Sequence, residues 1–331
     1  MDNTLPWVEK YRPNNFEDII SHVDVLNTLN NLIKNNKMQH MIFYGPPGTG
    51  KTTTILACAK KLYGAHYNNM ILELNGSDDR GINVVRDQIK KFSATDSRIN
   101  NLLSETNITK MKLVILDEAD AMTSDAQFAL RRVIEIYTSS TRFCLICNYL
   151  TKIIPALHSR CQIFRFQLID EESNLNKLKI IIIDENINIR ENVLKKIIEY
   201  SEGDMRKSLN VMQTLKMLYN EEEITLEMFN KTVYNLSDND IKMLISYTSN
   251  SIIDMYNNFT KLKKETYISN IDIVNEIITY YKKNITKKKT LKILDLFIEL
   301  AKIEINLMNN INSDVQLIAI CSIIYKFNNN T

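Results

Sequence analysis

Short apolar runs alternate with amphipathic stretches over the first half of the chain. The apolar runs cover 41–44, 70–74, 112–116, 142–147 and 162–166, and the amphipathic stretches cover 53–63, 82–93 and 124–137. Continuous apolar strands that are separated by helices are typical of a parallel sheet with helices on both faces. The pattern therefore predicts an α/β domain over residues 1–168.

Beyond residue 168 the strand pattern disappears and the apolar residues take a helical spacing. Apolar side chains recur three and four positions apart through 175–182, 193–198 and 209–215, which is the spacing of one buried helix face. A polar, turn-rich segment at 235–240 interrupts this pattern and indicates a domain boundary. We predict a helical domain over 169–234 and a second all-helical domain over 235–331.

Two local patterns add detail to the first domain. The stretch 124–137 opens with Ser124-Asp125-Ala126-Gln127, a capping-box pattern that places the Ser124 side chain at the helix start. The segment 93–111 is polar and is expected to form a mobile loop.

Composition and charge are those of an ordinary globular protein. Of the 331 residues, 44% are hydrophobic and 24% are charged, and the net charge is +2. The longest uninterrupted aliphatic stretch, 180–183, is far shorter than the roughly 18 residues that a membrane span needs. The first residues show no secretory leader pattern. We therefore expect a soluble intracellular protein that does not enter a membrane.

Cysteine and lysine patterns carry little functional signal. The five cysteines are odd in number and scattered, which fits a reducing compartment. Cys144 and Cys147 form a C-x-x-C inside a strand-like run without a second Cys or His pair nearby, so we favour strand packing over metal or redox use. Lysine groups lie at 261–264, 282–283 and 287–289. We interpret these lysines first as residues of solvated helix ends and loops. A DNA-binding patch or a nuclear-import signal is the alternative.

Residues 45–52 carry the strongest motif of the chain. They read Gly-Pro-Pro-Gly-Thr-Gly-Lys-Thr between an apolar strand and a helix, which matches the phosphate-binding loop G-x-x-x-x-G-K-[ST] in its required context. Lys51 is expected to reach the β- and γ-phosphates, and the Thr52 hydroxyl to bind Mg²⁺. An ordinary Gly-Pro turn is the alternative, and the strand–loop–helix context disfavours it. The predicted nucleotide-binding residues here are Gly45, Pro46, Pro47, Gly48, Thr49, Gly50, Lys51, Thr52 and Thr53.

Two carboxylates follow the apolar run 112–116. Asp117 and Glu118 stand at the carboxyl end of this predicted strand, where open α/β sheets bind their ligands. Asp117 would complete the Mg²⁺ site, and Glu118 would deprotonate the attacking water, a role worth roughly 10²–10⁴ in rate. A merely solubilising role at a strand end is the alternative. No Asn-Lys-x-Asp motif follows, which disfavours a signalling GTPase.

Three further residues are candidates for contacts to the γ-phosphate. Asn148 follows the run 142–147, and an amide there could bond the γ-phosphate and the lytic water, although Asn also commonly ends strands. Arg160 and Arg206 could supply cations around the transferred phosphoryl group. An isolated arginine is otherwise usually a surface residue.

Together these motifs resemble the small subunits of replication factor C, the eukaryotic sliding-clamp loader of the AAA+ class. The resemblance is dense from the first residues to about residue 215 and rests only on length and helical character beyond. It is carried by Glu-Lys-Tyr-Arg-Pro at 9–13, the loop at 45–52, the segment 73–82, Asp-Glu-Ala-Asp at 117–120, Asn148, Ser-Arg-Cys at 159–161 and Gly-Asp-Met-Arg at 203–206.

The resemblance implies an architecture and site roles. The fold would be a P-loop AAA+ core with a parallel sheet, then a helical lid, then an all-α collar that joins five subunits. Arg160 would enter the ATP site of the neighbouring subunit, and Arg206 would sense the γ-phosphate from the lid. The residues implied at the adenine end are Val8, Arg12 and Ile20, and those implied at the DNA backbone are Arg80 and Arg86.

The resemblance also implies a function. An ATPase with ATP and Mg²⁺ as cofactors would act in a nuclear heteropentamer that loads a ring-shaped sliding clamp onto primer–template DNA. Gly76 stands where the family more often has Ala, and the loop 95–111 is longer than usual. A non-hydrolysing structural subunit is the alternative. A homohexameric AAA+ remodeller is disfavoured because the sequence shows no aromatic pore loop.

Overall fold

The chain forms two compact units in a computed structural model, Met1–Glu221 and Glu222–Thr331. The structure describes residues 5–19, 21–77, 81–94, 111–220, 222–233, 240–243, 251–266, 268–283, 290–309 and 313–329. Most of the loop predicted over 93–111 lies outside the described residues. The division of the helical part into two domains at residue 234 stays a prediction.

A parallel sheet of five strands forms the centre of the first unit, as the sequence predicts. The strand order is β2-β3-β4-β1-β5. The central position of β4, between β3 and β1, brings the ends of these three strands to one edge. The strands are β1 (Met41–Tyr44), β2 (Ile71–Asn75), β3 (Lys112–Asp117), β4 (Thr141–Cys147) and β5 (Gln162–Arg165).

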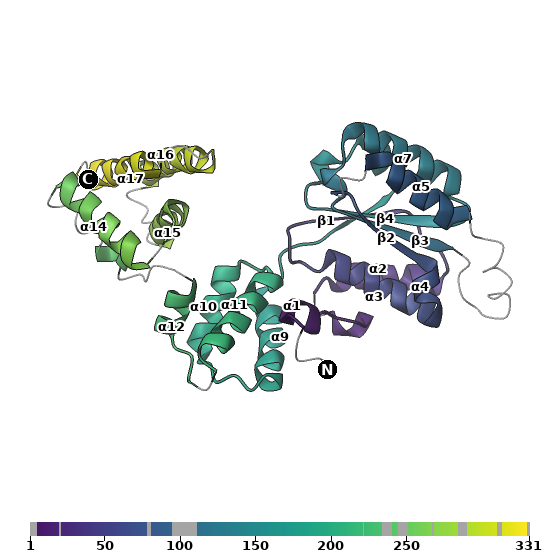
Figure 1. The fold of residues 1–331 in the computed structure, drawn as a ribbon, viewed down its shortest axis with the longest axis horizontal. Helices are drawn as coiled ribbons and strands as arrows, with labels where there is room; N and C mark the ends of the chain where they lie inside the picture. The colour runs from purple at the N-terminus through teal and green to yellow at the C-terminus, as the bar shows by residue number, and fades with distance from the viewer. Residues whose placement is uncertain are drawn as a thin grey trace. The chain divides into compact units, whose positions relative to one another are not determined.

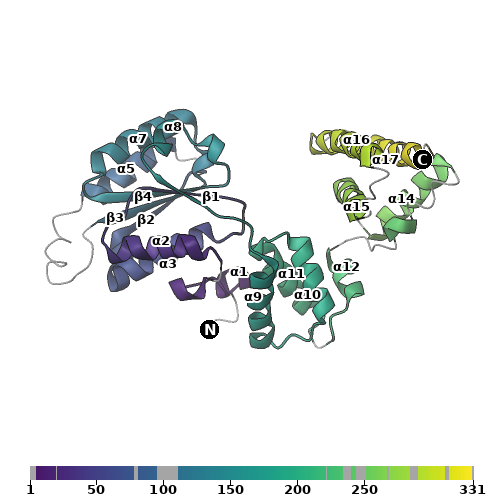
Figure 2. The ribbon, with the colours of Figure 1, turned by 180° about the vertical axis from the view of Figure 1, so that it is seen from behind.

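Helices cover both faces of this sheet (Figures 1 and 2). α2 (Val23–Lys34), α3 (Lys51–Tyr63) and α4 (Tyr67–Met70) lie on one face, and α5 (Gly81–Ala94), α7 (Ser124–Tyr137) and α8 (Pro155–His158) on the other. Alternate strand residues enter the two cores: Phe43 and Ile115 pack toward the first face, and Ile42 and Val114 toward the second. Burial on both faces explains why the strands are continuously apolar.

Cys144 and Cys147 of β4 lie in the cores on opposite faces of the sheet. This arrangement confirms the predicted role in strand packing. All five cysteines of the chain are free and buried. Burial raises the pKa of the Cys147 thiol to about 12.

The capping box predicted for α7 is wrong. Thr123, one residue earlier, is the N-cap, and its hydroxyl accepts a hydrogen bond from the backbone N–H of Ala126 at 3.3 Å. Ser124 is therefore the first residue inside the helix. Gln127 is buried and accepts a bond from the backbone N–H of Ile154 at 2.8 Å. Its amide thus connects the segment after β4 to Met122, the residue before the N-cap, to whose carbonyl oxygen it donates at 3.2 Å.

The remaining elements of the first unit are short helices and three lid helices. The short ones are α1 (Trp7–Lys10), η1 (Phe16–Asp18), η2 (Gly64–His66), η3 (Ala119–Ala121) and η4 (Leu150–Lys152). The lid helices are α9 (Glu171–Asp184), α10 (Glu191–Ser201) and α11 (Met205–Leu218), which confirms the predicted helical character after residue 168.

The second unit is helical in its described residues and has its own apolar core. Its longer helices are α12 (Leu226–Val233), α14 (Ile252–Thr266), α15 (Asn270–Lys283), α16 (Thr290–Met308) and α17 (Ser313–Asn329). Within the described parts of the chain, no helix combines the length and the apolar character that a membrane crossing requires.

Candidate functional site

The predicted phosphate loop connects β1 to α3 at the carboxyl edge of the sheet. Its backbone has positive φ at Gly48 (70°) and Gly50 (89°), a conformation that side-chain-bearing residues adopt only with strain. The loop thereby curls over the N-terminus of α3, which starts at Lys51. The positive end of a helix dipole behind such a loop favours an anionic ligand.

The ammonium of Lys51 lies at the centre of this loop and is largely buried. Nζ donates hydrogen bonds to the carbonyl oxygens of Gly45 (2.8 Å) and Pro46 (2.7 Å) and to Oδ1 of Asn148 (3.0 Å). Burial lowers the pKa of Lys51, while the Asp117 carboxylate raises it. All its partners are neutral oxygens, so the positive charge is available to an anion.

The two residues predicted to bind the metal meet directly. Oγ1 of Thr52 donates to Oδ2 of Asp117 at 2.7 Å. The other oxygen of Asp117 accepts from the backbone N–H of Glu118 at 2.8 Å. Glu118 has a φ of 51° and an exposed side chain. The residue thus directly follows the end of β3 and exposes its side chain to solvent.

Asn148 is held in place by Asp120, a residue to which the sequence analysis assigned no role. Oδ2 of Asp120 accepts hydrogen bonds from the backbone N–H groups of Asn148 (3.1 Å) and Tyr149 (3.2 Å). The end of β4 is therefore fixed to the segment after β3. Because Asn148 also bonds Lys51, the three strand ends form one connected hydrogen-bond network.

A cavity with about 810 Å³ of empty space, part of it open to solvent, adjoins the loop. Its walls come from the N-terminal segment, the phosphate loop and the lid. The predicted residues that line it are Val8, Arg12, Gly48, Thr49, Gly50, Thr53 and Arg206. Ile20 lies outside the described residues, although its neighbours Ile19 and Ser21 line the cavity. The cavity is concave and largely apolar, as small-molecule sites usually are.

Three of the other loop residues face a second hollow. Gly45, Pro46 and Pro47 line it together with Asn148 and Tyr149. The predicted loop residues thus divide between two sides, and the hydrogen-bond partners of Lys51 all line the second hollow.

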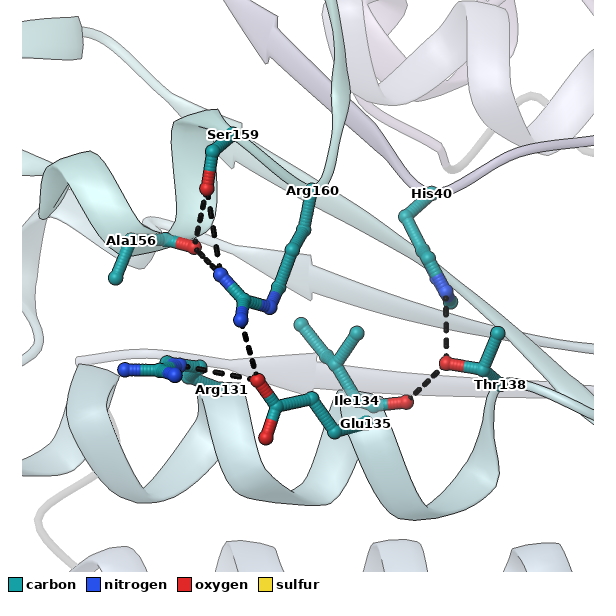
Figure 3. Close-up of polar contacts among 8 residues, drawn as sticks. All are labelled: His40, Arg131, Ile134, Glu135, Thr138, Ala156, Ser159 and Arg160. Carbon is teal, nitrogen blue, oxygen red and sulfur yellow. Dashed lines mark hydrogen bonds and ion pairs between the residues drawn. The ribbon is translucent and has the colours of Figure 1, made fainter.

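Arg160 does not join this cavity among the lining residues that the structure describes. Its Nη1 donates to the carbonyl oxygen of Ala156 at 2.8 Å, and its Nη2 pairs with Oε1 of Glu135 at 2.6 Å (Figure 3). Nε of Arg131 reaches the same oxygen at 3.1 Å. The bond from Arg131 lowers the pKa of Glu135 most, and Arg160 adds to this effect. The guanidinium of Arg160 is therefore held on α7 and α8.

The predicted DNA contacts remain predictions. Arg80 lies outside the described residues. Arg86 belongs to α5, and its side chain is not among those described.

Sequence reasoning missed two residues that contact the loop. Nε2 of His22 lies 3.2 Å from the carbonyl oxygen of Thr49, and burial lowers the pKa of this imidazole. Asp204 caps α11 by accepting from the N–H groups of Arg206 and Lys207. A Cβ atom built on Gly48 would lie 1.8 Å from Oδ1 of Asp204. An N-cap pattern before 205–218 could have indicated Asp204, whereas nothing in the sequence points to His22.

Two family profiles match the first unit. The ATPase family associated with various cellular activities (AAA) matches residues 41–168. The RCF1/5-like AAA+ ATPase lid domain matches residues 176–217. These ranges coincide with the sheet domain and with the lid helices.

Relatives that match over most of the chain are 39–45% identical to it. The chain is 45% identical over 324 residues to replication factor C subunit 5 of Arabidopsis thaliana, covering 96% of this chain and 86% of the relative. Identity to replication factor C subunit 5 of Homo sapiens is 43% over 319 residues (95% and 89% covered). Replication factor C subunit 3 of Saccharomyces cerevisiae is 39% identical over 316 residues (94% and 90% covered).

Among solved structures, the fold is similar to that of the Thermotoga maritima RuvB Holliday junction branch migration motor. The TM-score is 0.51 at 17% identity, and the match covers 71% of this chain and 78% of RuvB. At this identity the likeness concerns the fold alone.

Proposed function

Because the chain belongs to the replication factor C subunits of the AAA+ clamp loader, we propose that it binds ATP with Mg²⁺ and hydrolyses ATP within that assembly. It corresponds to the subunit numbered five in animals and three in yeasts. The observation that carries the proposal is the presence of two neighbouring hydrogen-bonded pairs at the sheet edge, Lys51 with Asn148 and Thr52 with Asp117. They place an anion-binding loop beside a pair of oxygen ligands.

The residues of the site fit both cofactors. Backbone N–H groups of the loop 45–50 and the ammonium of Lys51 would hold the phosphates. The Thr52 hydroxyl and the Asp117 carboxylate are hard oxygen donors, the kind that Mg²⁺ prefers. The metal, when bound, would neutralise charge on the β- and γ-phosphates. The nucleoside end would occupy the cavity beside Val8 and Arg12.

Hydrolysis would use further residues around the phosphate and metal sites. The exposed carboxylate of Glu118 would orient and deprotonate water, and Asn148 would bond the γ-phosphate. Arg206 lines the cavity and would contact the phosphates from the lid. Arg160 is held apart from the cavity on α7 and α8, which supports its use in the site of a neighbouring subunit. The isolated chain should therefore be nearly inactive, since it would lack the arginine that its own neighbour supplies.

In the assembly, nucleotide binding would close the subunit interfaces and hold an opened sliding clamp around primed DNA. Hydrolysis would then release the clamp. The partners would be the other loader subunits of a heteropentamer, the clamp, and the DNA backbone through Arg80 and Arg86. Such contacts carry no sequence information, which suits a loader that acts at any primer–template junction. This work would take place in the nucleus.

The variant Glu118→Gln tests this function in the reconstituted complex. It removes the base and keeps the side-chain volume, so ATP binding should persist while phosphate release from this site and clamp release are lost. Glu191→Gln, at an exposed residue of α10, is the matched control. Unchanged phosphate release and clamp loading in the Glu118 variant would favour a structural subunit that keeps its nucleotide unhydrolysed.

A further inference from the structure

Glu185, the residue that caps the C-terminus of α9, accepts hydrogen bonds from three side chains of two distant segments. Oε1 accepts from Nζ of Lys10 (2.5 Å) and from the hydroxyl of Tyr11 (2.7 Å), and Oε2 accepts from Nζ of Lys216 (2.9 Å). Lys10 and Tyr11 come from the N-terminal segment, whereas Lys216 comes from α11. One carboxylate therefore connects the start of the chain to two lid helices.

The Glu185 carboxylate connects the N-terminal segment to the lid strongly because it is charged and is shielded from water. Its side chain is 10% exposed. Burial alone would raise the pKa of Glu185, but the bonds from Lys10, Tyr11 and Lys216 outweigh it and lower the pKa to about 2. Hydrogen bonds between charged groups are about twice as strong as neutral ones, and here water competes little for the partners.

Further contacts tie the same two parts together. The backbone N–H of Trp7 donates to Oε1 of Gln213 on α11 at 3.1 Å. Nζ of Lys216 also donates to the carbonyl oxygen of Glu185 at 2.6 Å, and it lies 5.8 Å from the centre of the Trp7 ring. α1 thus packs on the lid as if it were one of the lid's own helices.

Both parts supply walls to the cavity beside the phosphate loop. Val8, Tyr11 and Arg12 line it from the N-terminal segment, and Arg206 and Leu209 line it from α11. Tyr11 is at once a wall of the cavity and a donor to Glu185. The position of this wall relative to α11 is therefore set by Glu185, which is not itself a lining residue.

We propose that Glu185 is a positioning residue for the nucleoside end of ATP, because it fixes the N-terminal wall to the lid before the nucleotide arrives. A pocket formed in advance binds more tightly, since less ordering remains to be done on binding. The residues that would bind the phosphates, Lys51 and Thr52, lie at the edge of the sheet and make no bond to Glu185 in the contacts described above. This inference rests on the proposed ATP binding.

The test compares two ligands on the full chain, ATP and inorganic tripolyphosphate, each with Mg²⁺, by titration calorimetry. Tripolyphosphate carries the phosphates without a nucleoside, so it reports on the loop and Arg206 alone. In Glu185→Gln the affinity for ATP should fall about tenfold, the scale of a lost charged hydrogen bond, while that for tripolyphosphate should stay within about twofold. Glu191→Gln, at an exposed lid carboxylate, should change neither affinity.

A second variant keeps the test independent of folding defects. Tyr11→Phe retains the ring in the cavity and removes only the bond to Glu185, so it should lower ATP affinity in the same direction by a smaller factor. Unchanged ATP affinity in both variants would overturn the proposal. An equal loss for ATP and tripolyphosphate would also overturn it, because that result indicates a damaged lid. Failure of the unmodified chain and complex to bind ATP would instead contradict the proposed function, and the inference with it.

Discussion

The hydroxyl of Thr52 donates a hydrogen bond of 2.7 Å to Oδ2 of Asp117. This contact joins the first turn of α3 to the last residue of β3. Two oxygen atoms from residues that lie 65 positions apart in the sequence are thereby brought to one point. Because α3 begins directly after the phosphate loop, a cation bound to this pair would lie beside the phosphates.

Asp117→Asn should weaken binding of ATP only when the metal is present. The amide can still accept the bond from Thr52, but it lacks the charge that attracts Mg²⁺. We expect a loss of metal affinity at least as large as the roughly 10–100-fold that removal of a partner of a metal ligand causes, read from ATP titrations with Mg²⁺ and with a chelator. An identical Mg²⁺ dependence in the variant and the original chain would show that Asp117 holds no metal.

Asp120→Ala should lower both stability and hydrolysis in the complex. The substitution leaves the exposed N–H groups of Asn148 and Tyr149 without their acceptor, which costs about 0.5–1.5 kcal/mol because water can replace it in part. Displacement of Asn148 would then impair phosphate release. Urea unfolding and steady-state hydrolysis measure the two effects. Asp295→Ala, at an exposed residue of α16, provides the comparison and should leave both values near those of the original chain.

Gly48→Ala should be more damaging than Gly50→Ala. Both glycines have positive φ, so a side chain at either position costs about 1–2 kcal/mol in backbone strain. Only at Gly48 would the new Cβ also meet Asp204, whereas at Gly50 no atom lies within 4 Å of it. Thermal unfolding and ATP titration measure the losses in the two variants. The difference between the variants gives the cost of the clash with Asp204, because the backbone strain is common to both. Equal losses would mean that the approach of the loop to Asp204 contributes nothing.

Acid should remove the stability that Glu185 contributes. Its pKa falls from 4.5 to about 2 on folding, so the unfolded chain binds the proton more readily. The contribution is complete above the unfolded pKa and is lost as the pH falls from about 4.5 toward about 2. Urea unfolding between about pH 5 and pH 3 should show a shallower decline for Glu185→Gln. Parallel curves would assign the acid sensitivity to other carboxylates.

The sheet could be predicted closely because each strand is buried on both faces. Runs such as 41–44 and 112–116 are continuously apolar and end in turn or acidic residues, and the observed strands match them within one or two residues. The order of the strands in the sheet, in contrast, could not be predicted from the sequence. No local pattern indicates that β4 lies between β3 and β1, since pairing depends on how the crossovers pack.

Residues that act across long separations could not be found from the sequence. Glu185 looks like an ordinary charged residue at a helix end, yet two of its partners precede it by about 175 residues. His22 and its bond to Thr49 are hidden for the same reason. The capping error at α7 is smaller in scale: Thr123 and Ser124 are both good N-caps, and Thr123 is the one that caps the helix.

The burial of every cysteine makes the folded chain inert toward thiol-reactive dyes, since such reagents attack an accessible thiolate. Four of the thiols lie in the first unit, and Cys321 lies in the second. Alkylation at Cys321 would consequently record the opening of the C-terminal helices, and alkylation at the other four would record that of the sheet unit. If one cysteine were added to the surface, it would be the only reactive thiol of the folded chain. A fluorescent dye could then be attached to it without first replacing the five natural cysteines.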